Sequence, residues 1–106
     1  MSNLEAAFHQ EMLDSYHQLA EQGYRATYFL RMIQQHGGLQ AARQLIAQEG
    51  TSEGLHRIWD LKRLDLSAEA LALKPEFRSL FSDEERQRAR QHLADLHYRA
   101  PWDAQD

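Results

Sequence analysis

In residues 55–81, LHRIWDLKRLDLSAEALALKPEFRSLF, leucines and aromatic residues recur too closely for a loop, yet they are interrupted too often for one continuous helix. This pattern predicts several short helices that share one core. Ser67 is well placed to cap one of these helices, and Pro75 suits the first residue of another. We expect Trp59 to be a central residue of the core.

Three longer helices are predicted before this stretch, because apolar residues recur there at three- and four-residue steps. The first helix follows a capping box formed by Ser2 and Glu5 and ends near Gly23. The second and third helices meet at Gly37 and Gly38. The buried stripe of the second helix is expected to contain Tyr28, Phe29, Met32 and Ile33.

The last predicted helix begins at Ser82, which has the spacing of a second capping box with Glu85, and runs to about His97. After it, the chain is expected to fray unless Trp102 docks on the domain. The sequence therefore predicts an all-α fold, with a single compact domain of about five to seven helices, several of them short, over residues 1–98. Residues 99–106 are expected to form a flexible C-terminal tail.

Composition limits the classes of protein that this chain could belong to. Its 106 residues suit one domain, and 42% hydrophobic with 26% charged residues is the balance of a globular protein that folds by itself. No cysteine is present, and no apolar stretch approaches the roughly 20 residues needed to cross a bilayer. We expect a cytoplasmic protein without a membrane segment. The net charge of −4 disfavours non-specific binding to nucleic acid.

Residues 24–46, YRATYFLRMIQQHGGLQAARQLI, and residues 53–90, EGLHRIWDLKRLDLSAEALALKPEFRSLFSDEERQRAR, resemble a family of small uncharacterised bacterial helical domains. The similarity covers residues 16–98. Members of that family occur as standalone short proteins or as tails of longer ones, which implies a module that docks. The resemblance supplies no functional residue, and Arg25 departs from the asparagine that the family prefers as a helix cap. The matching positions are Tyr24, Phe29, Leu30, His36, Gly37, Gly38, Ala42, Leu45, Trp59, Leu64, Leu66, Glu69, Ala70, Leu71, Pro75, Phe77, Leu80, Phe81, Glu84 and Glu85.

One pair of residues suggests an enzyme. Arg31 and His36, in RMIQQH, resemble the spaced arginine and histidine of the helical HEPN ribonucleases, in which arginine stabilises charge on the phosphate and histidine is the general acid or base. In a chain with ten arginines and six histidines, roughly two such spacings are expected by chance. Two further pairs have this spacing, Arg86 with His92 and Arg90 with His97. We therefore expect no enzymatic activity and keep an HEPN-like ribonuclease as an alternative.

No cofactor or metal is predicted. The histidines are not spaced as two ligands one helical turn apart, the HExxH motif is absent, and Gly37-Gly38 lacks the further glycine and lysine of a phosphate-binding loop.

A helix-turn-helix that binds DNA is the second alternative. In residues 26–48 the helix after the glycine pair would present Gln40, Arg43, Gln44 and Gln48 to base edges. Alignment on either glycine leaves the small and the apolar positions of that motif unfilled, and the acidic net charge also disfavours DNA.

The function that remains is a non-catalytic protein-interaction or regulatory module that acts on a larger bacterial protein. An inhibitor or accessory of a defence or nucleic-acid enzyme would fit, because an acidic face could mimic phosphate. The expected partner is another protein of unknown identity, and self-association through the same surface is the alternative. Arginine and aromatic residues are enriched at interface anchors, so the expected contacts are Arg86, Arg90, Tyr98 and Trp102.

Overall fold

Six α-helices and two 3-10 helices make up the computed structural model, which describes residues 3–103. No strand occurs in this range, and the predicted all-α fold is confirmed. In chain order the elements are α1 (Asn3–Glu21), α2 (Thr27–His36), α3 (Gly38–Ala47), α4 (Glu53–Asp60), η1 (Leu64–Leu66), α5 (Ala68–Ala72), η2 (Pro75–Leu80) and α6 (Asp83–Ala94).

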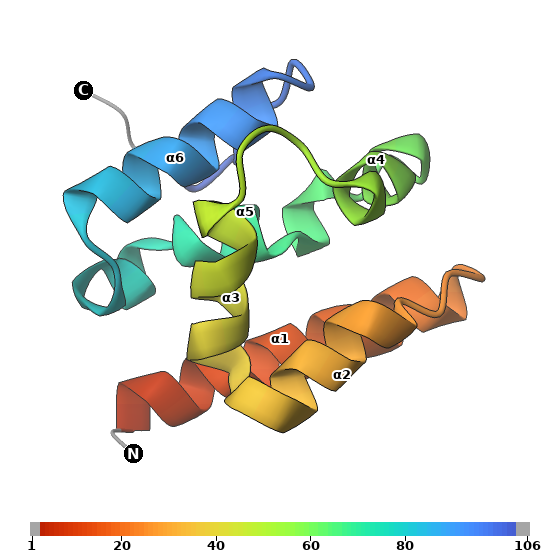
Figure 1. The fold of residues 1–106 in the computed structure, drawn as a ribbon, viewed down its shortest axis with the longest axis horizontal. Helices are drawn as coiled ribbons and strands as arrows, with labels where there is room; N and C mark the ends of the chain where they lie inside the picture. Colours follow the sequence, from red (N-terminus) through yellow and green to blue (C-terminus); the bar gives the residue numbers. More distant parts are fainter. Residues whose placement is uncertain (1–2, 104–106) are drawn as a thin grey trace.

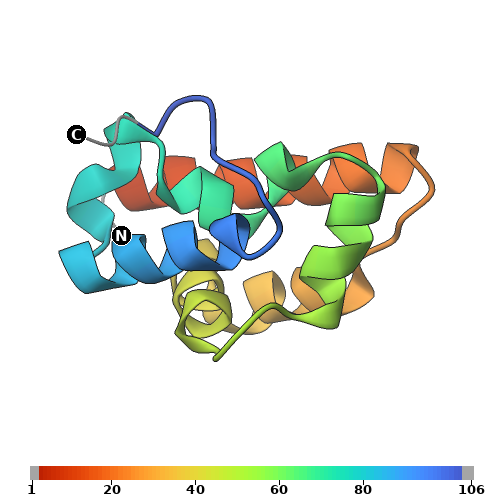
Figure 2. The ribbon, with the colours of Figure 1, turned by 90° about the horizontal axis from the view of Figure 1, so that it is seen from above.

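Helix α3 organises the fold. It leaves the α1 and α2 pair and runs through the middle of the molecule towards α6 (Figure 1), and it packs against α1, α2, α5 and α6. Helix α4 lies at the end of the molecule away from the start of α6 (Figure 2) and packs mainly on η1. Because α4 is held on one side only, it forms an outlying wall of the domain.

Three phenylalanines from distant parts of the sequence meet in the core. Phe8 of α1 is fully buried and makes edge-to-face contacts with Phe77 and Phe81, with ring centroids 5.0 and 5.3 Å apart. Burying each such side chain stabilises the fold by about 1.5–3 kcal/mol. The short helices of residues 55–81 therefore fold back onto α1, as their leucines and aromatics predicted.

The helix starts in the second half of the chain confirm the sequence predictions. The hydroxyls of Ser67 and Ser82 each accept a backbone N–H three residues ahead, and Glu85 completes the capping box with Ser82. Ser52 caps α4 in the same way. Pro75 is the first residue of η2. The capping box predicted at Ser2 lies outside the described residues.

Two aromatic side chains are placed differently from the prediction. Tyr28, expected in the buried stripe of the second helix, is 64% exposed, and Trp59, expected at the centre of the core, is 46% exposed. Only Met32 and Ile33 are buried on α2, and only Leu55 and Ile58 on α4. Both helices are short and lie at the edge of the domain. Two buried side chains on each helix are therefore enough to attach it to the core.

The prediction of a flexible tail from residue 99 is wrong for residues 99–103. Ala100 and Asp103 are buried, and the indole Nε1 of Trp102 donates a hydrogen bond of 2.7 Å to the carbonyl oxygen of Ala70 on α5. Lys74 lies over the Trp102 ring, 4.9 Å from its centroid. This segment is therefore part of the packed domain, and residues 104–106 lie outside the described range.

Candidate functional site

The structure uses the four side chains predicted as partner contacts within the fold, so they do not form one free surface. Arg86 is only 7% exposed, and burial lowers the pKa of its guanidinium. Arg90 makes two hydrogen bonds, 2.8 and 3.0 Å, to the carboxylate of Asp103. Trp102 is held on α5 as described above. The phenol of Tyr98 is partly buried against the core, and burial raises its pKa.

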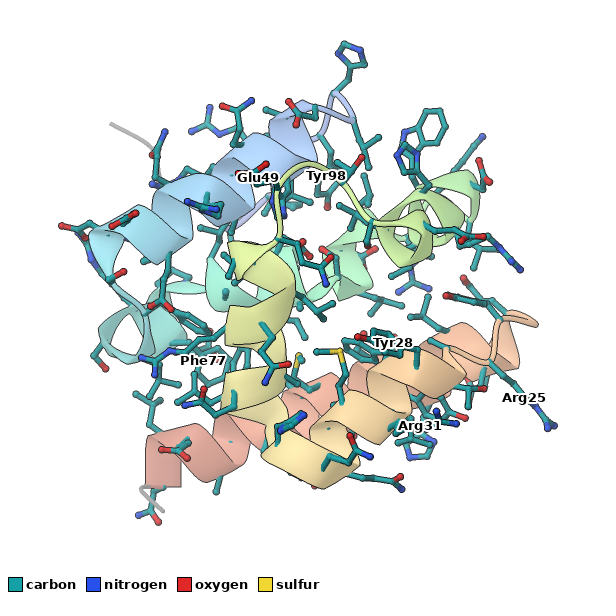
Figure 3. All side chains as sticks on the ribbon, viewed as in Figure 1. Arg25, Tyr28, Arg31, Glu49, Phe77 and Tyr98 are labelled. Carbon is teal, nitrogen blue, oxygen red and sulfur yellow. The ribbon has the colours of Figure 1, made fainter. Side chains whose placement is uncertain are left out.

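The arginine–histidine pairs are not brought together in a cleft with a shared ligand site. Arg31, labelled on α2 in Figure 3, and His36 are both exposed. In the other two pairs, Arg90 forms an ion pair with Asp103, and His92 forms one with Glu69. The geometry therefore gives no support to the ribonuclease alternative.

Helix α3 is poorly placed to enter a DNA groove. Gln40 and Gln44 are exposed, but the guanidinium of Arg43 donates to the carbonyl oxygen of Leu80 at 2.9 Å and forms an ion pair of 3.3 Å with Glu85. The helix packs against four other helices, and its exposed residues, Gln40, Gln44 and Ala47, include no cation to contact phosphate.

A cleft that the sequence did not predict lies between α2 and α4 and has a volume of about 380 Å³. We call it the α2–α4 cleft. Figure 3 shows Tyr28 on the edge of α2 that faces α4. Most of the lining side chains are aliphatic or aromatic, and α3 and α5 form the floor. The lining residues are Tyr24, Ala26, Tyr28, Phe29, Leu45, Gln48, Ser52, Glu53, Gly54, Leu55, Arg57, Ile58, Ser67, Ala68 and Glu69.

The rim of the α2–α4 cleft combines aromatic rings with charge. The Arg57 guanidinium lies over the ring of Tyr24, 4.9 Å from its centroid, and so links α4 to the segment before α2. Tyr28 lies on α2, one turn further along. Glu53, in the first turn of α4, adds an exposed carboxylate. Exposed aromatics and an arginine beside an apolar recess are typical of a protein interface.

A buried ion pair closes the cleft on the α5 side. Glu69 and His92 are 5% and 3% exposed, and Glu69 Oε2 lies 2.8 Å from His92 Nδ1. His92 Nε2 lies 2.9 Å from the carbonyl oxygen of Gln48. Because both ring nitrogens face acceptors, the imidazolium is the form that satisfies both. The hydrogen bond to Glu69 accordingly raises the pKa of His92.

The second carboxylate oxygen of Glu69 has unused hydrogen-bonding capacity. Glu69 lines the α2–α4 cleft, and no described residue donates to its Oε1. Among the side-chain N and O atoms of residues 3–103, those that are both fully enclosed and unbonded belong to arginines, so Glu69 Oε1 is not fully enclosed. A carboxylate has about four lone-pair sites, of which His92 uses one.

Sequence reasoning missed this site for identifiable reasons. Glu69 and His92 are 23 residues apart on two different helices, and no sequence pattern pairs one with the other. Tyr24 and Tyr28 had the spacing of core residues. Only the final packing of α4 away from α2 turns them into cleft residues.

In the part of the chain that the structure describes, no three His, Asp or Glu side chains gather in a way that could hold a metal ion. Among residues 3–103, no helix is both long and apolar enough to cross a bilayer.

No protein-family model, curated protein or solved structure matches this chain. The resemblance to small bacterial helical domains therefore gains no support from these comparisons. The function has to be inferred from the α2–α4 cleft and its surroundings.

Proposed function

We propose that this chain is a non-catalytic interaction domain that binds another protein through the α2–α4 cleft. The observation that carries this proposal is the combination of an apolar recess of about 380 Å³ with a rim residue, Tyr28, that is 64% exposed. An exposed ring beside an apolar recess extends the contiguous apolar surface, and contiguous apolar surface rimmed by polar residues marks interaction sites. The proposed contact surface thus moves from α6 and the segment after it, where the sequence analysis expected it, to α2 and α4.

Two properties of the cleft favour a protein partner over a nucleic acid. Its charged lining residues are Glu53, Arg57 and Glu69, and Glu69 is paired with His92, so the cleft has no excess of positive charge that would attract phosphate. The aromatic side chains Tyr24 and Tyr28 lie beside an apolar wall, where a partner side chain would be desolvated on both sides. Pockets of this kind bind the buried side chains that contribute most of the affinity in protein interfaces.

Affinity capture with a matched pair of variants tests the proposal. Tyr28→Ala removes an exposed ring and should leave the fold intact, whereas Gln40→Ala changes an exposed residue on α3, outside the cleft. The wild-type domain and Gln40→Ala should retain the same protein from a lysate of the native host, and Tyr28→Ala should retain at least tenfold less. Equal retention by all three would place the contact elsewhere. RNA cleavage that is lost in a His36→Ala variant would instead favour the ribonuclease.

A further inference from the structure

Three features of the α2–α4 cleft specify the chemistry of its occupant. The walls are apolar over most of their area and include Phe29, Leu45, Leu55 and Ile58. The polar group at the α5 side is a carboxylate, Glu69, that is more than nine-tenths buried. No described residue donates to its Oε1. An occupant must therefore be apolar along its stem and must donate hydrogen bonds at its tip.

We infer that the α2–α4 cleft accepts a lysine or arginine side chain from a segment of the partner protein, with the alkyl stem against the apolar walls and the cationic head at Glu69 Oε1. This inference rests on the proposed function, since it names the chemistry of the partner that the cleft would bind. Lysine and arginine are the side chains that combine a long methylene stem with a cationic head.

The charges of the described residues favour a basic head over other donors. A hydrogen bond between a cation and a carboxylate is roughly twice as strong as a neutral one, and a partially buried site weakens it less by screening. An acidic side chain at the same place would leave two carboxylates facing each other. The net charge of −4 adds a long-range attraction for a basic segment.

The geometry of the rim favours a side chain that belongs to a protein. The Arg57–Tyr24 contact joins α4 to the segment before α2, and Tyr28, one turn further along on α2, extends into solvent. A free amine would fill the recess and leave this aromatic rim uncovered. A peptide segment that runs across α2 and α4 would cover it, as the surroundings of an anchor residue do in protein interfaces.

Selection from a random peptide display library on the purified full chain tests the inference. Peptides that bind the wild-type domain but not Tyr28→Ala are retained and sequenced. We expect them to share a lysine or arginine next to apolar residues. Replacement of that basic residue by norleucine, which keeps the stem and removes the charge, should weaken binding at least tenfold in a calorimetric titration.

A double-mutant cycle then assigns the basic residue to Glu69. In Glu69→Gln the loss caused by norleucine should shrink to less than threefold, whereas in Glu84→Gln, a change on the exposed surface of α6, it should stay at least tenfold. If Glu69→Gln does not fold, the amide NMR signals of Gly54, Ala68 and Ala70 in the wild-type domain replace it. They should move with the lysine peptide and much less with the norleucine peptide.

Each remaining outcome overturns the inference in a recognisable way. Peptides that depend on Tyr28 but carry no common basic residue would support the proposed function. They would contradict a basic side chain as the occupant of the cleft. Phenethylamine that binds as tightly as the peptides would assign the cleft to a small amine. Self-association that depends on Tyr28, seen by sedimentation, would assign it to a second copy of the chain. A library with no Tyr28-dependent peptide would reject the inference, while the capture experiment still decides the proposed function.

Discussion

The backbone N–H of Gly38 donates a hydrogen bond of 2.8 Å to Nδ1 of His9, so that a side chain of α1 receives the first amide of α3. A Cβ atom on Gly38 would lie only 2.6 Å from the Cα atom of His9. The two helices therefore approach each other as closely as a residue without a side chain allows. This crossing fixes the direction of α3, on which most of the other helices pack.

We expect Gly38→Ala to lower the free energy of unfolding by about 2–3 kcal/mol, because backbone atoms must shift to admit the methyl group. Urea denaturation followed by circular dichroism measures this change. Gly54→Ala is the matched control, since its Cβ would lie at an ordinary 3.7 Å from the Tyr24 hydroxyl. As Gly54 lies within α4, this variant should be more stable by up to about 1 kcal/mol. A Gly38→Ala protein as stable as the wild type would contradict the tight crossing.

Two arginines on α6 should differ sharply in what they contribute to stability. Arg86 has a buried Nε without a hydrogen bond, and its ion partner, Asp83, lies 4.0 Å away with a fully exposed side chain. Arg86→Met should therefore change the free energy of unfolding by less than about 1 kcal/mol, because an unsatisfied buried group is removed and no buried charge is left behind.

Arg90→Met should be much more harmful, because it leaves the carboxylate of Asp103, whose side chain is 2% exposed, without its partner. We expect a loss of about 3 kcal/mol, as for other broken buried pairs. Thermal and urea unfolding of both variants side by side make the comparison. Equal losses in the two variants would mean that Arg86 has a stabilising contact that the structure does not contain.

Local features of the fold could be predicted from the sequence, because they depend on residues that are close in the chain. Ser67 and Ser82 cap helices by bonds to amides three residues ahead, and Pro75 starts η2 through its own fixed φ angle. Such interactions are complete within one turn of helix. They do not depend on where the rest of the chain lies.

The faces of the edge helices could not be predicted in the same way. Tyr28 lies in a run of apolar residues that offers two overlapping stripes, and the packing of α3 decides that Met32 and Ile33 are the buried ones. The pairing of Glu69 with His92 likewise requires α5 and α6 to be adjacent. The candidate site was not predicted, because its residues are brought together by packing between segments that are distant in the sequence.

Two residues with left-handed backbone conformation offer a way to stabilise the domain. Lys62 and His97 both have a φ angle of 59°, and each follows the last turn of a helix. The amides of the next residues, Arg63 and Tyr98, bond back to carbonyls five residues earlier, at 3.0 Å, as in a Schellman motif. Glycine is the residue that adopts this conformation without strain.

Lys62→Gly and His97→Gly should each raise the free energy of unfolding by about 1 kcal/mol, through relief of left-handed strain. Gly23→Ala is the reverse control. Its φ angle is 92° and a Cβ there would meet no atom within 4 Å, so its expected loss of about 1 kcal/mol reflects backbone strain alone. Chemical denaturation of the three variants gives the signs. A loss of stability in Lys62→Gly or His97→Gly would reveal a structural role for the original side chain.

The ion pair between Glu69 and His92 should make the stability of the domain depend on pH. The hydrogen bond to Glu69 is the largest cause of the raised pKa of His92, and the charges of Glu69 and Asp95 and the carbonyl of Gln48 act in the same direction. A group whose pKa is higher in the folded state contributes stability that is fully present below its unfolded pKa of about 6.5. That contribution is lost as the pH rises through the folded pKa, so the wild-type domain should become less stable between pH 6 and pH 9.

Urea unfolding of the wild type and of His92→Gln at pH 6, 7, 8 and 9 measures this dependence. The difference in unfolding free energy between the two proteins should be largest at pH 6 and should shrink as the pH rises, because the neutral imidazole can donate to only one of its two acceptors. Burial also raises the pKa of Tyr98, but the titration of this phenol affects stability only above pH 10, outside the range from pH 6 to pH 9. Glu69→Gln should flatten the pH dependence in the same way as His92→Gln. A difference that is constant, or that grows with pH, would show that His92 is neutral in the folded domain and that the pair is an ordinary hydrogen bond.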